Sequence, residues 1–230
     1  MLRGRQRGFS LVEWAVASTI GLLVLSGVIG LHARQSAIAA DGLARTRLHR
    51  TLHDALALML DDLRRAGFRA ADPTLHDLRD NPFMQAPNRL RVEPTDPGCV
   101  LFAYDANRDG RVGVGGKRPL AAGESGANME QFGYRLRSGR LEMRAGGQPF
   151  DCRHGRWQAV TGPDILVTDL HFTVHRRCVS TTLGGCAGAL YRQRVAVFLR
   201  GALRASPGRS LTLEGAVTLR NDFHAPAPVR

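Results

Sequence analysis

The feature that most restricts how this chain can fold is an apolar stretch near its N-terminus, Phe9–Leu31. Its 23 residues contain a single charge, Glu13, and follow Arg3, Arg5 and Arg7. A helix of this length rises about 34 Å, which is enough to cross a hydrocarbon core of roughly 30 Å. The three arginines predict that residues 1–8 stay on the cytoplasmic side of the membrane and that the chain beyond the apolar stretch is exported.

Glu13 separates the interpretations of this segment, because an unpaired carboxylate in lipid costs about 2.5–3.5 kcal/mol. A secretory signal peptide with a cleavage site near Ala37-Ile38-Ala39 is one alternative, but the apolar run of such a peptide has only about 7–15 residues. A plain signal anchor is the second alternative, and it gives no reason for the carboxylate. An intramembrane acid instead needs a partner of opposite charge.

The run Arg7-Gly8-Phe9-Ser10-Leu11-Val12-Glu13 resembles the type IV prepilin motif. The resemblance implies that prepilin peptidase cleaves between Gly8 and Phe9 and methylates the new N-terminus at Phe9. It also implies that Glu13, the fifth residue of the mature chain, pairs with the N-terminal amine of a neighbouring subunit during filament assembly. Each charge would then compensate for the desolvation of the other.

Apolar residues at helical spacing continue beyond the apolar stretch, and no proline precedes Pro73. The pattern predicts one helix from Phe9 to Ala66, ended at Gly67. The apolar positions are Leu43, Leu48, Leu52, Leu56, Met59, Leu60 and Leu63. The predicted organisation is a leader at 1–8, a transmembrane and filament-core helix at 9–31, an amphipathic half of the same helix at 32–66, and a periplasmic globular head at 67–230.

The head contains short runs that are typical of β-strands. They lie at 100–104, 131–136, 141–144, 157–160, 165–174, 191–203 and 211–219, and residues 136–141 read as a hairpin turn. One long helix followed by strands indicates an α+β fold in which the apolar stripe of the helix covers an antiparallel sheet. This arrangement is similar to the pilin fold.

Four further segments narrow the resemblance to the minor pilins of the PilW-like and PulJ-like family. They are residues 60–68 at the end of the helix, Cys99 to Asp105, Glu130 to Leu136, and Leu219-Arg220-Asn221. The resemblance implies a subunit processed by prepilin peptidase, anchored in the bacterial inner membrane, and incorporated with other minor and major pilins at or near the tip of a type IV pilus. The corresponding pseudopilin of a type II secretion system remains an alternative.

Composition leaves alternatives of other classes open. The net charge is +12 and Lys117 is the only lysine, so the positive charge comes almost entirely from arginine. A membrane-anchored protein that binds DNA, or a surface adhesin, is therefore a second kind of function, although the arginines are scattered along the sequence. A secreted enzyme is a third, but the sequence has no nucleophile elbow, phosphate loop or dinucleotide fingerprint. We therefore expect no enzymatic activity.

The four cysteines, Cys99, Cys152, Cys178 and Cys186, indicate disulfides in an exported chain. Four cysteines allow three pairings. The short segment between Cys178 and Cys186 favours a bridge between these two, which leaves Cys99 to pair with Cys152.

The run Asp105-Ala106-Asn107-Arg108-Asp109-Gly110 places oxygen-bearing side chains at alternate positions and glycine at the sixth, as the first half of a calcium-binding EF-hand loop does. The acid that normally ends such a loop is absent, but Glu124 or Glu130 could supply a ligand from further along the chain. The sequence therefore predicts calcium as a candidate cofactor at Asp105, Asn107 and Asp109. The alternative is an Asp/Asn/Gly turn that satisfies only its own backbone.

Overall fold

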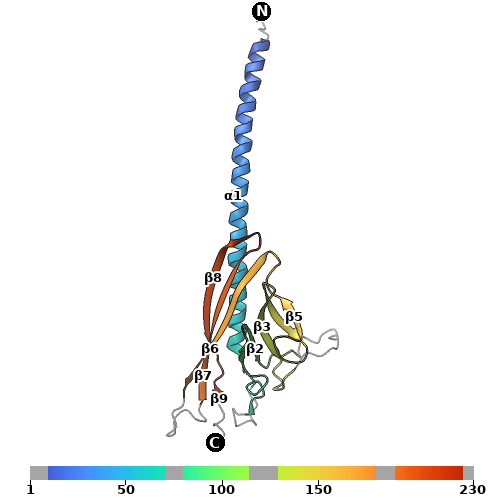
Figure 1. Ribbon diagram of the computed structural model, residues 1–230, viewed down its shortest axis with the longest axis vertical. Coiled ribbons are helices and arrows are strands. Elements are labelled where there is room, and N and C mark those ends of the chain that lie inside the picture. The colour runs from blue at the N-terminus through green and yellow to red at the C-terminus, as the bar shows by residue number, and fades with distance from the viewer. Residues whose placement is uncertain (1–9, 71–79, 114–128, 180–189, 225–230) are drawn as a thin grey trace, which may run out of the picture. The chain divides into compact units, whose positions relative to one another are not determined.

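A computed structural model describes residues 10–70, 80–113, 129–179 and 190–224. It contains one helix and nine strands within these ranges. The chain divides into two compact units, Met1–Arg47 and Leu48–Arg230. The helix α1 spans Leu11–Arg65 (Figure 1). This confirms the predicted long helix, and the α+β class is confirmed with it.

The helix ends where the sequence predicted. Gly67 adopts a φ of +74°, the left-handed conformation that commonly follows the last helical turn. Phe68 N donates to the carbonyl oxygen of Arg65 at 2.9 Å and closes that turn. A side chain at Gly67 would also approach Met84 Cε to 2.7 Å, so both backbone conformation and space favour glycine at this position.

Within the second unit, the part of α1 from Leu48 onward presents one apolar stripe to the core. The buried residues recur every three or four positions, as expected for one face of a helix. They are Leu48, Leu52, Ala55, Leu56, Met59, Leu63 and Ala66. This stripe contributes to the same buried cluster as side chains from both sheets, so the helix closes the core of the unit.

The first sheet has five antiparallel strands in the order β1-β2-β3-β4-β5. Their bounds are Arg91–Glu93, Asp96–Ala103, Gln131–Arg137, Arg140–Gly146 and Arg156–Ala159. The hairpin predicted between β3 and β4 is confirmed: Ser138 and Gly139 have φ values of 51° and 72°, as a two-residue turn of this kind requires. The short strand β1 was not predicted, because its three residues carry no periodic signal.

The second sheet consists of three long antiparallel strands in the order β6-β7-β8, and a short strand, β9, pairs with β7 (Figure 1). Their bounds are Ile165–Cys178, Leu190–Leu203, Ser206–Thr218 and Phe223–His224. The helix packs closely on this sheet: a Cβ added to Gly201 would lie 3.1 Å from Leu52 Cδ2, and one at Gly215 would lie 2.8 Å from Leu60 Cδ1.

The described residues therefore form two sheets, whereas the sequence predicted a single one. The ladder of the first sheet ends at β5, after which Gly162-Pro163 turns the chain: Ile165 N donates to the carbonyl oxygen of Gly162 at 3.2 Å. Proline has no N–H for a ladder, so this segment does not continue the pairing. The strand that follows, β6, pairs with β7 instead.

Candidate assembly helix and acidic loop

The first turn of α1 is held by Ser10 and Glu13. Ser10 Oγ accepts a hydrogen bond from Val12 N at 3.3 Å, and Glu13 Oε2 accepts one from Ser10 N at 3.4 Å. This reciprocal pattern is a variant of the capping box in which the serine hydroxyl bonds the N–H two residues on, and it satisfies backbone N–H groups that a helix start leaves without partners. Glu13 therefore has a role within its own chain in addition to the assembly role that the resemblance implies.

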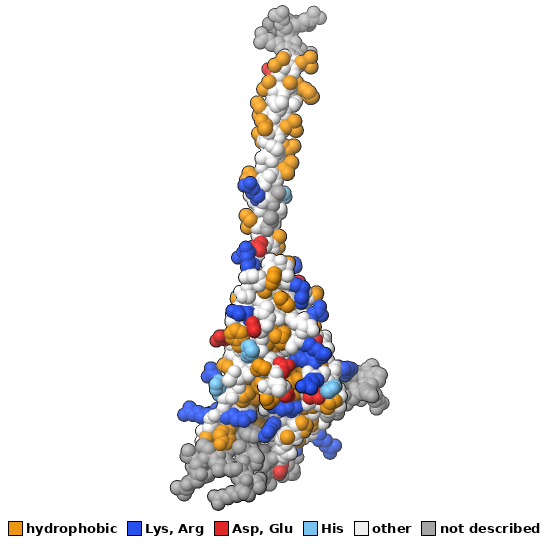
Figure 2. All heavy atoms as spheres, in the orientation of Figure 1, with side chains coloured by type: hydrophobic (Ala, Val, Ile, Leu, Met, Phe, Trp, Pro, Cys, Tyr) orange, Lys and Arg blue, Asp and Glu red, His pale blue; other side chains and the backbone are white. Residues whose placement is uncertain are grey.

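Apolar side chains cover the helix in the first unit and are exposed there (Figure 2). Leu11 is 86% exposed, Trp14 is 70% exposed and Leu23 is 72% exposed. Among the described residues, α1 is long and apolar enough to cross a membrane. Such a surface in a single chain needs lipid or other apolar surfaces to cover it.

The hydroxyl groups in this apolar segment are satisfied within the helix. Ser18 Oγ donates to the carbonyl oxygen of Trp14 at 2.7 Å, and Thr19 Oγ1 donates to that of Val16 at 2.8 Å. Ser26 Oγ likewise donates to a carbonyl one turn earlier. Groups that bond internally in this way are tolerated in lipid. Glu13 is the exception, because its cap does not neutralise its charge.

The end of α1 carries a buried acid to which the sequence analysis gave no role. Asp62 is 5% exposed. Its Oδ2 accepts a hydrogen bond from Tyr134 Oη at 2.5 Å, and its Oδ1 accepts bonds from Tyr104 Oη at 3.3 Å and Arg65 Nη2 at 2.5 Å. Burial, and then the charge of Asp62, raise the pKa of both tyrosines. The acid lies three residues after Met59, so helical spacing could have placed it on the buried face.

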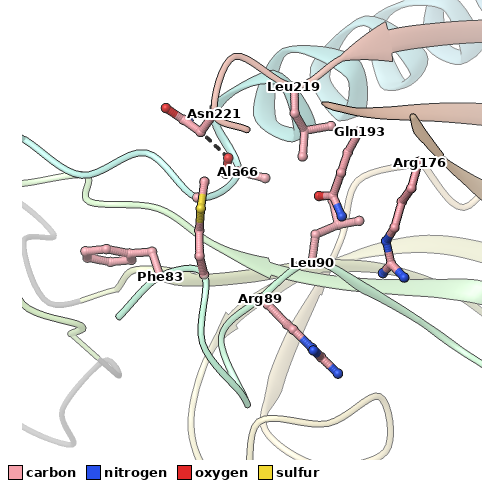
Figure 3. Close-up of a pocket in the computed structure, with 10 residues that line it drawn as sticks. Ala66, Phe83, Arg89, Leu90, Arg176, Gln193, Leu219 and Asn221 are labelled. Atoms are coloured by element: carbon pink, nitrogen blue, oxygen red, sulfur yellow. Dashed lines mark hydrogen bonds between the residues drawn. The ribbon is translucent and has the colours of Figure 1, made fainter. Parts of the chain in front are cut away.

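Backbone groups at the end of α1 are satisfied by residues distant in the sequence. Asn221 Nδ2 donates to the carbonyl oxygen of Ala66 at 3.1 Å (Figure 3), and Asn81 Nδ2 donates to that of Gly67 at 2.9 Å. A pocket lies beside these contacts, bordered by the helix end, the segment before β1, and strands β6 and β7 of the second sheet. Its volume is about 10 Å³, room for about one water molecule, so it is too small for an organic ligand.

The four segments that carry the family resemblance contact one another at this helix end. Asp62 lies in the first segment, Tyr104 in the second, Tyr134 in the third and Asn221 in the fourth, and each takes part in the contacts described above. The segments that carry the resemblance therefore supply contacts that connect the end of the helix to the rest of the head.

The acidic loop, residues 105–113, follows β2, and Glu130 directly precedes β3. In the β2–β3 pair Ala103 lies opposite Gln131, so the register brings Asp105 and Glu130 to the same end of the two strands. Carboxylate oxygens of Asp105, Asp109 and Glu130 lie within 4.8 Å of one another. The structure thus brings Glu130, one of the two candidate closing ligands, to the predicted loop. Glu124 lies outside the described residues.

Backbone N–H groups donate hydrogen bonds to the two buried carboxylates, those of Asp105 and Glu130. Glu130 Oε1 accepts from Ala106 N at 2.9 Å, and Oε2 accepts from Gly113 N at 2.7 Å. Asp105 Oδ2 accepts from the N–H groups of Ala70 and Gly110 at 2.9 and 3.1 Å. Burial raises the pKa of Glu130. The backbone hydrogen bonds to its carboxylate lower this pKa but do not outweigh the effect of burial.

Asn107 positions Asp109 within the exposed part of the loop. Asn107 Nδ2 donates to Asp109 Oδ2 at 2.9 Å, and Asn107 Oδ1 accepts from Asp109 N at 3.0 Å. The backbone bond from Arg111 and the side-chain bond from Asn107 hold the pKa of Asp109 below its usual range. Asn107 thus orients the Asp109 carboxylate, whose oxygen lies close to those of the two buried acids.

The predicted bridge between Cys99 and Cys152 is present and joins β2 to the segment after β4. Both cysteines pack with Leu101, Phe150 and Trp157 in a second small core. Cys186 lies outside the described residues, so its pairing with Cys178 stays a prediction. Gly8 and Phe9, the predicted cleavage and methylation positions, also lie outside them.

An exposed apolar helix headed by a glutamate and followed by antiparallel sheets defines the class of type IV pilin-like proteins. Within this class, the chain belongs to the family of prepilin peptidase-dependent protein B, whose model matches residues 41–219. The model of the prokaryotic N-terminal methylation motif matches residues 3–29. Comparisons with curated proteins and with solved structures gave no match.

Proposed function

We propose that this chain is a minor pilin: a structural subunit that prepilin peptidase processes between Gly8 and Phe9, and that assembles at or near the tip of a type IV pilus. The family match and the methylation motif support processing by this peptidase. The role is structural rather than enzymatic. The tip position and the priming of assembly rest on the resemblance to PilW-like minor pilins.

The observation that carries the proposal is Glu13, the single charge in an apolar helix segment whose side chains are exposed. Cleavage after Gly8 would create a free amine at Phe9, four residues before this glutamate. In a filament, the amine of one subunit and Glu13 of its neighbour can neutralise each other away from water. The same surroundings would cover the exposed apolar side chains.

Before assembly, we place the subunit in the bacterial inner membrane as a single-pass protein with a periplasmic head. The arginines before residue 9 favour this orientation. The disulfide between Cys99 and Cys152 supports it, because such bonds persist in oxidising compartments. Its partners are then prepilin peptidase, the major pilin and other minor pilins.

Processing is tested by expressing the full chain with and without prepilin peptidase and measuring the intact mass and N-terminal sequence. We expect the peptidase to yield a chain that begins at methylated Phe9. Gly8→Leu should block cleavage, whereas the matched control Gly4→Ala should be cut normally. A mature N-terminus at Ala40, or a chain left intact by the active peptidase, would contradict the proposal.

The minor role is tested by deleting the gene in its own host and by labelling a tagged chain on sheared filaments. We expect far fewer filaments in the deletion strain, and label confined to filament ends in the complemented strain. Label along the shaft in amounts similar to the major subunit would overturn the minor role. Normal filaments together with a loss of protein secretion would instead identify a type II secretion pseudopilin.

A further inference from the structure

One oxygen of the acidic loop is left without a partner in the part of the chain that the structure describes. Asp105 is only 2% exposed, and its Oδ1 accepts no hydrogen bond there. A buried, unpaired carboxylate oxygen is costly because it has lost its water without gaining a donor. Backbone N–H groups of the same loop bind the carboxylate of Glu130, which is 0% exposed, so two acids are buried side by side.

In the described ranges, no cationic side chain forms an ion pair with these acids. The guanidinium of Arg69 borders the loop, since a Cβ added to Gly110 would lie 3.4 Å from Arg69 Nε. Among the described residues, however, no ion pair joins Arg69 to Asp105 or Glu130. A cation that fits between the carboxylates would compensate both charges and give Asp105 Oδ1 a partner.

The geometry points to a divalent metal site, which we propose is a calcium site formed by the carboxylates of Asp105, Asp109 and Glu130. Hard oxygen ligands select calcium or magnesium rather than zinc or copper. Backbone N–H groups already orient both buried acids, so the ligands are preorganised. Asn107 is a positioning residue here, because its side chain holds Asp109.

Calcium suits this site better than magnesium for two reasons. The three carboxylates come from a loop and from a separate strand end, and calcium tolerates such irregular coordination completed by water, whereas magnesium demands a near-ideal octahedron. Calcium sites of extracellular modules bind with dissociation constants of about 10⁻⁴ to 10⁻³ M. Saturation at such concentrations rests on the proposed function, which places the head outside the cytoplasm.

The site would give calcium a structural effect on the head. The loop contacts the chain just after α1 through Ala70 N, and it lies at the end of the β2–β3 pair. A bound ion would therefore join the segment after the helix to the first sheet.

The test is calorimetric titration of the full chain, purified in detergent and freed of metal, with calcium chloride and separately with magnesium chloride. We expect calcium to bind with a dissociation constant of about 10⁻⁴ to 10⁻³ M and to raise the melting temperature of the chain, and magnesium to bind at least about tenfold more weakly. Absence of calcium binding at about 10 mM would overturn the site.

Variants locate the binding. Asp105→Asn and Glu130→Gln should each weaken calcium binding at least about tenfold. Asp109→Asn changes an exposed side chain, so this variant should fold and still lose affinity. Asp96→Asn is the matched control, because Asp96, at the start of β2, also accepts a backbone hydrogen bond but lies outside the cluster. Unchanged affinity in Asp109→Asn, or equal loss in Asp96→Asn, would contradict the assignment.

The same preparation separates this inference from the proposed function. Cleavage at Gly8 by prepilin peptidase does not involve the acidic loop, so it should proceed with or without calcium. A chain that is processed and assembled but binds no calcium would remove the metal site and leave the minor pilin proposal intact. A chain that binds calcium but is not processed would support the metal site and contradict the minor pilin proposal.

Discussion

Tyr134 and Asp62, which are 72 residues apart, form a 2.5 Å hydrogen bond between the tyrosine hydroxyl and Oδ2 of the buried carboxylate. The contact joins the end of α1 to β3. Tyr104 approaches the other oxygen of the same carboxylate more loosely, at 3.3 Å. The position of the helix on the first sheet therefore depends on an acid that must be paired to be buried.

The first prediction concerns these two tyrosines. Tyr134→Phe removes the shorter hydrogen bond and leaves Asp62 Oδ2 buried without it, so the free energy of unfolding should fall by about 1–3 kcal/mol. Tyr104→Phe should cost less, because its bond is longer and Arg65 also serves that oxygen. Urea unfolding of the detergent-purified chain measures both. Equal losses of unfolding free energy in the two variants would show that the shorter hydrogen bond stabilises the chain no more than the longer one.

The second prediction is the loss of stability at alkaline pH. The pKa values of Tyr104 and Tyr134 are raised in the folded chain, whereas unfolded tyrosine has a pKa of about 10. Above that pH the unfolded state binds fewer protons than the folded state, so the free energy of unfolding must fall as pH rises. Below it, this contribution is fully present. The double variant with phenylalanine at both positions should show a shallower decline between about pH 10 and 12, and an unchanged slope would contradict the assignment.

Much of the fold could be predicted from the sequence because its signals are periodic. The helix stripe, Gly67 at its end and the strands β2 to β8 follow apolar spacing and turn residues that the chain displays locally. The division into two sheets could not be predicted in this way. It depends on β6 pairing with β7 and not with β5, the strand before it, and the local spacing of apolar residues does not record which of its neighbours a strand leaves unpaired.

Buried charged residues were the second feature that the sequence alone could not predict. Arg144 is fully buried, and its guanidinium donates to the backbone carbonyls of Gln131, Gly147 and Pro149. Hydropathy assigns an arginine to the surface, so only the folded chain identifies it as a core residue. The acidic loop could be predicted in part. Its ligand spacing is a local pattern, but the approach of Glu130 is set by the register of β2 and β3.

The third prediction concerns the disulfide between Cys99 and Cys152, which are separated by 53 positions. Replacing both cysteines by serine should lower the free energy of unfolding by about 4 kcal/mol, because the unfolded chain regains the entropy of a long loop. The equivalent change at Cys178 and Cys186 should cost about 2–3 kcal/mol, since that loop is short. Urea unfolding of the two double variants checks the order, and a reversed order would contradict it.

The fourth prediction concerns Gly133, in the middle of β3. A Cβ at this position would lie 2.8 Å from the carbonyl oxygen of Val100 and 2.7 Å from Leu101 Cδ2. The oxygen belongs to the backbone of β2 and cannot move aside, so Gly133→Ala should destabilise the chain by about 1–3 kcal/mol. Gly208→Ala is the control, because no atom lies within 4 Å of a Cβ built there. Equal melting temperatures of the two variants would contradict the steric explanation.

The fifth prediction separates two roles of Glu13, which caps its own helix and is proposed to neutralise the amine of a neighbouring subunit. Glutamine can replace glutamate in a capping box but carries no charge. Glu13→Gln should therefore keep the start of the helix, whereas Glu13→Ala removes both cap and charge. Both variants should still be cut after Gly8.

If charge pairing drives assembly, both variants should be processed normally and both should be depleted from purified filaments. If the cap is the requirement, Glu13→Gln should enter filaments as the unmodified chain does and only Glu13→Ala should be lost. Quantitative immunoblots of sheared filaments against total membranes measure this incorporation. A charge-pairing role predicts the first result, because the amine of the neighbouring Phe9 would face an uncharged amide and remain uncompensated in an apolar filament core.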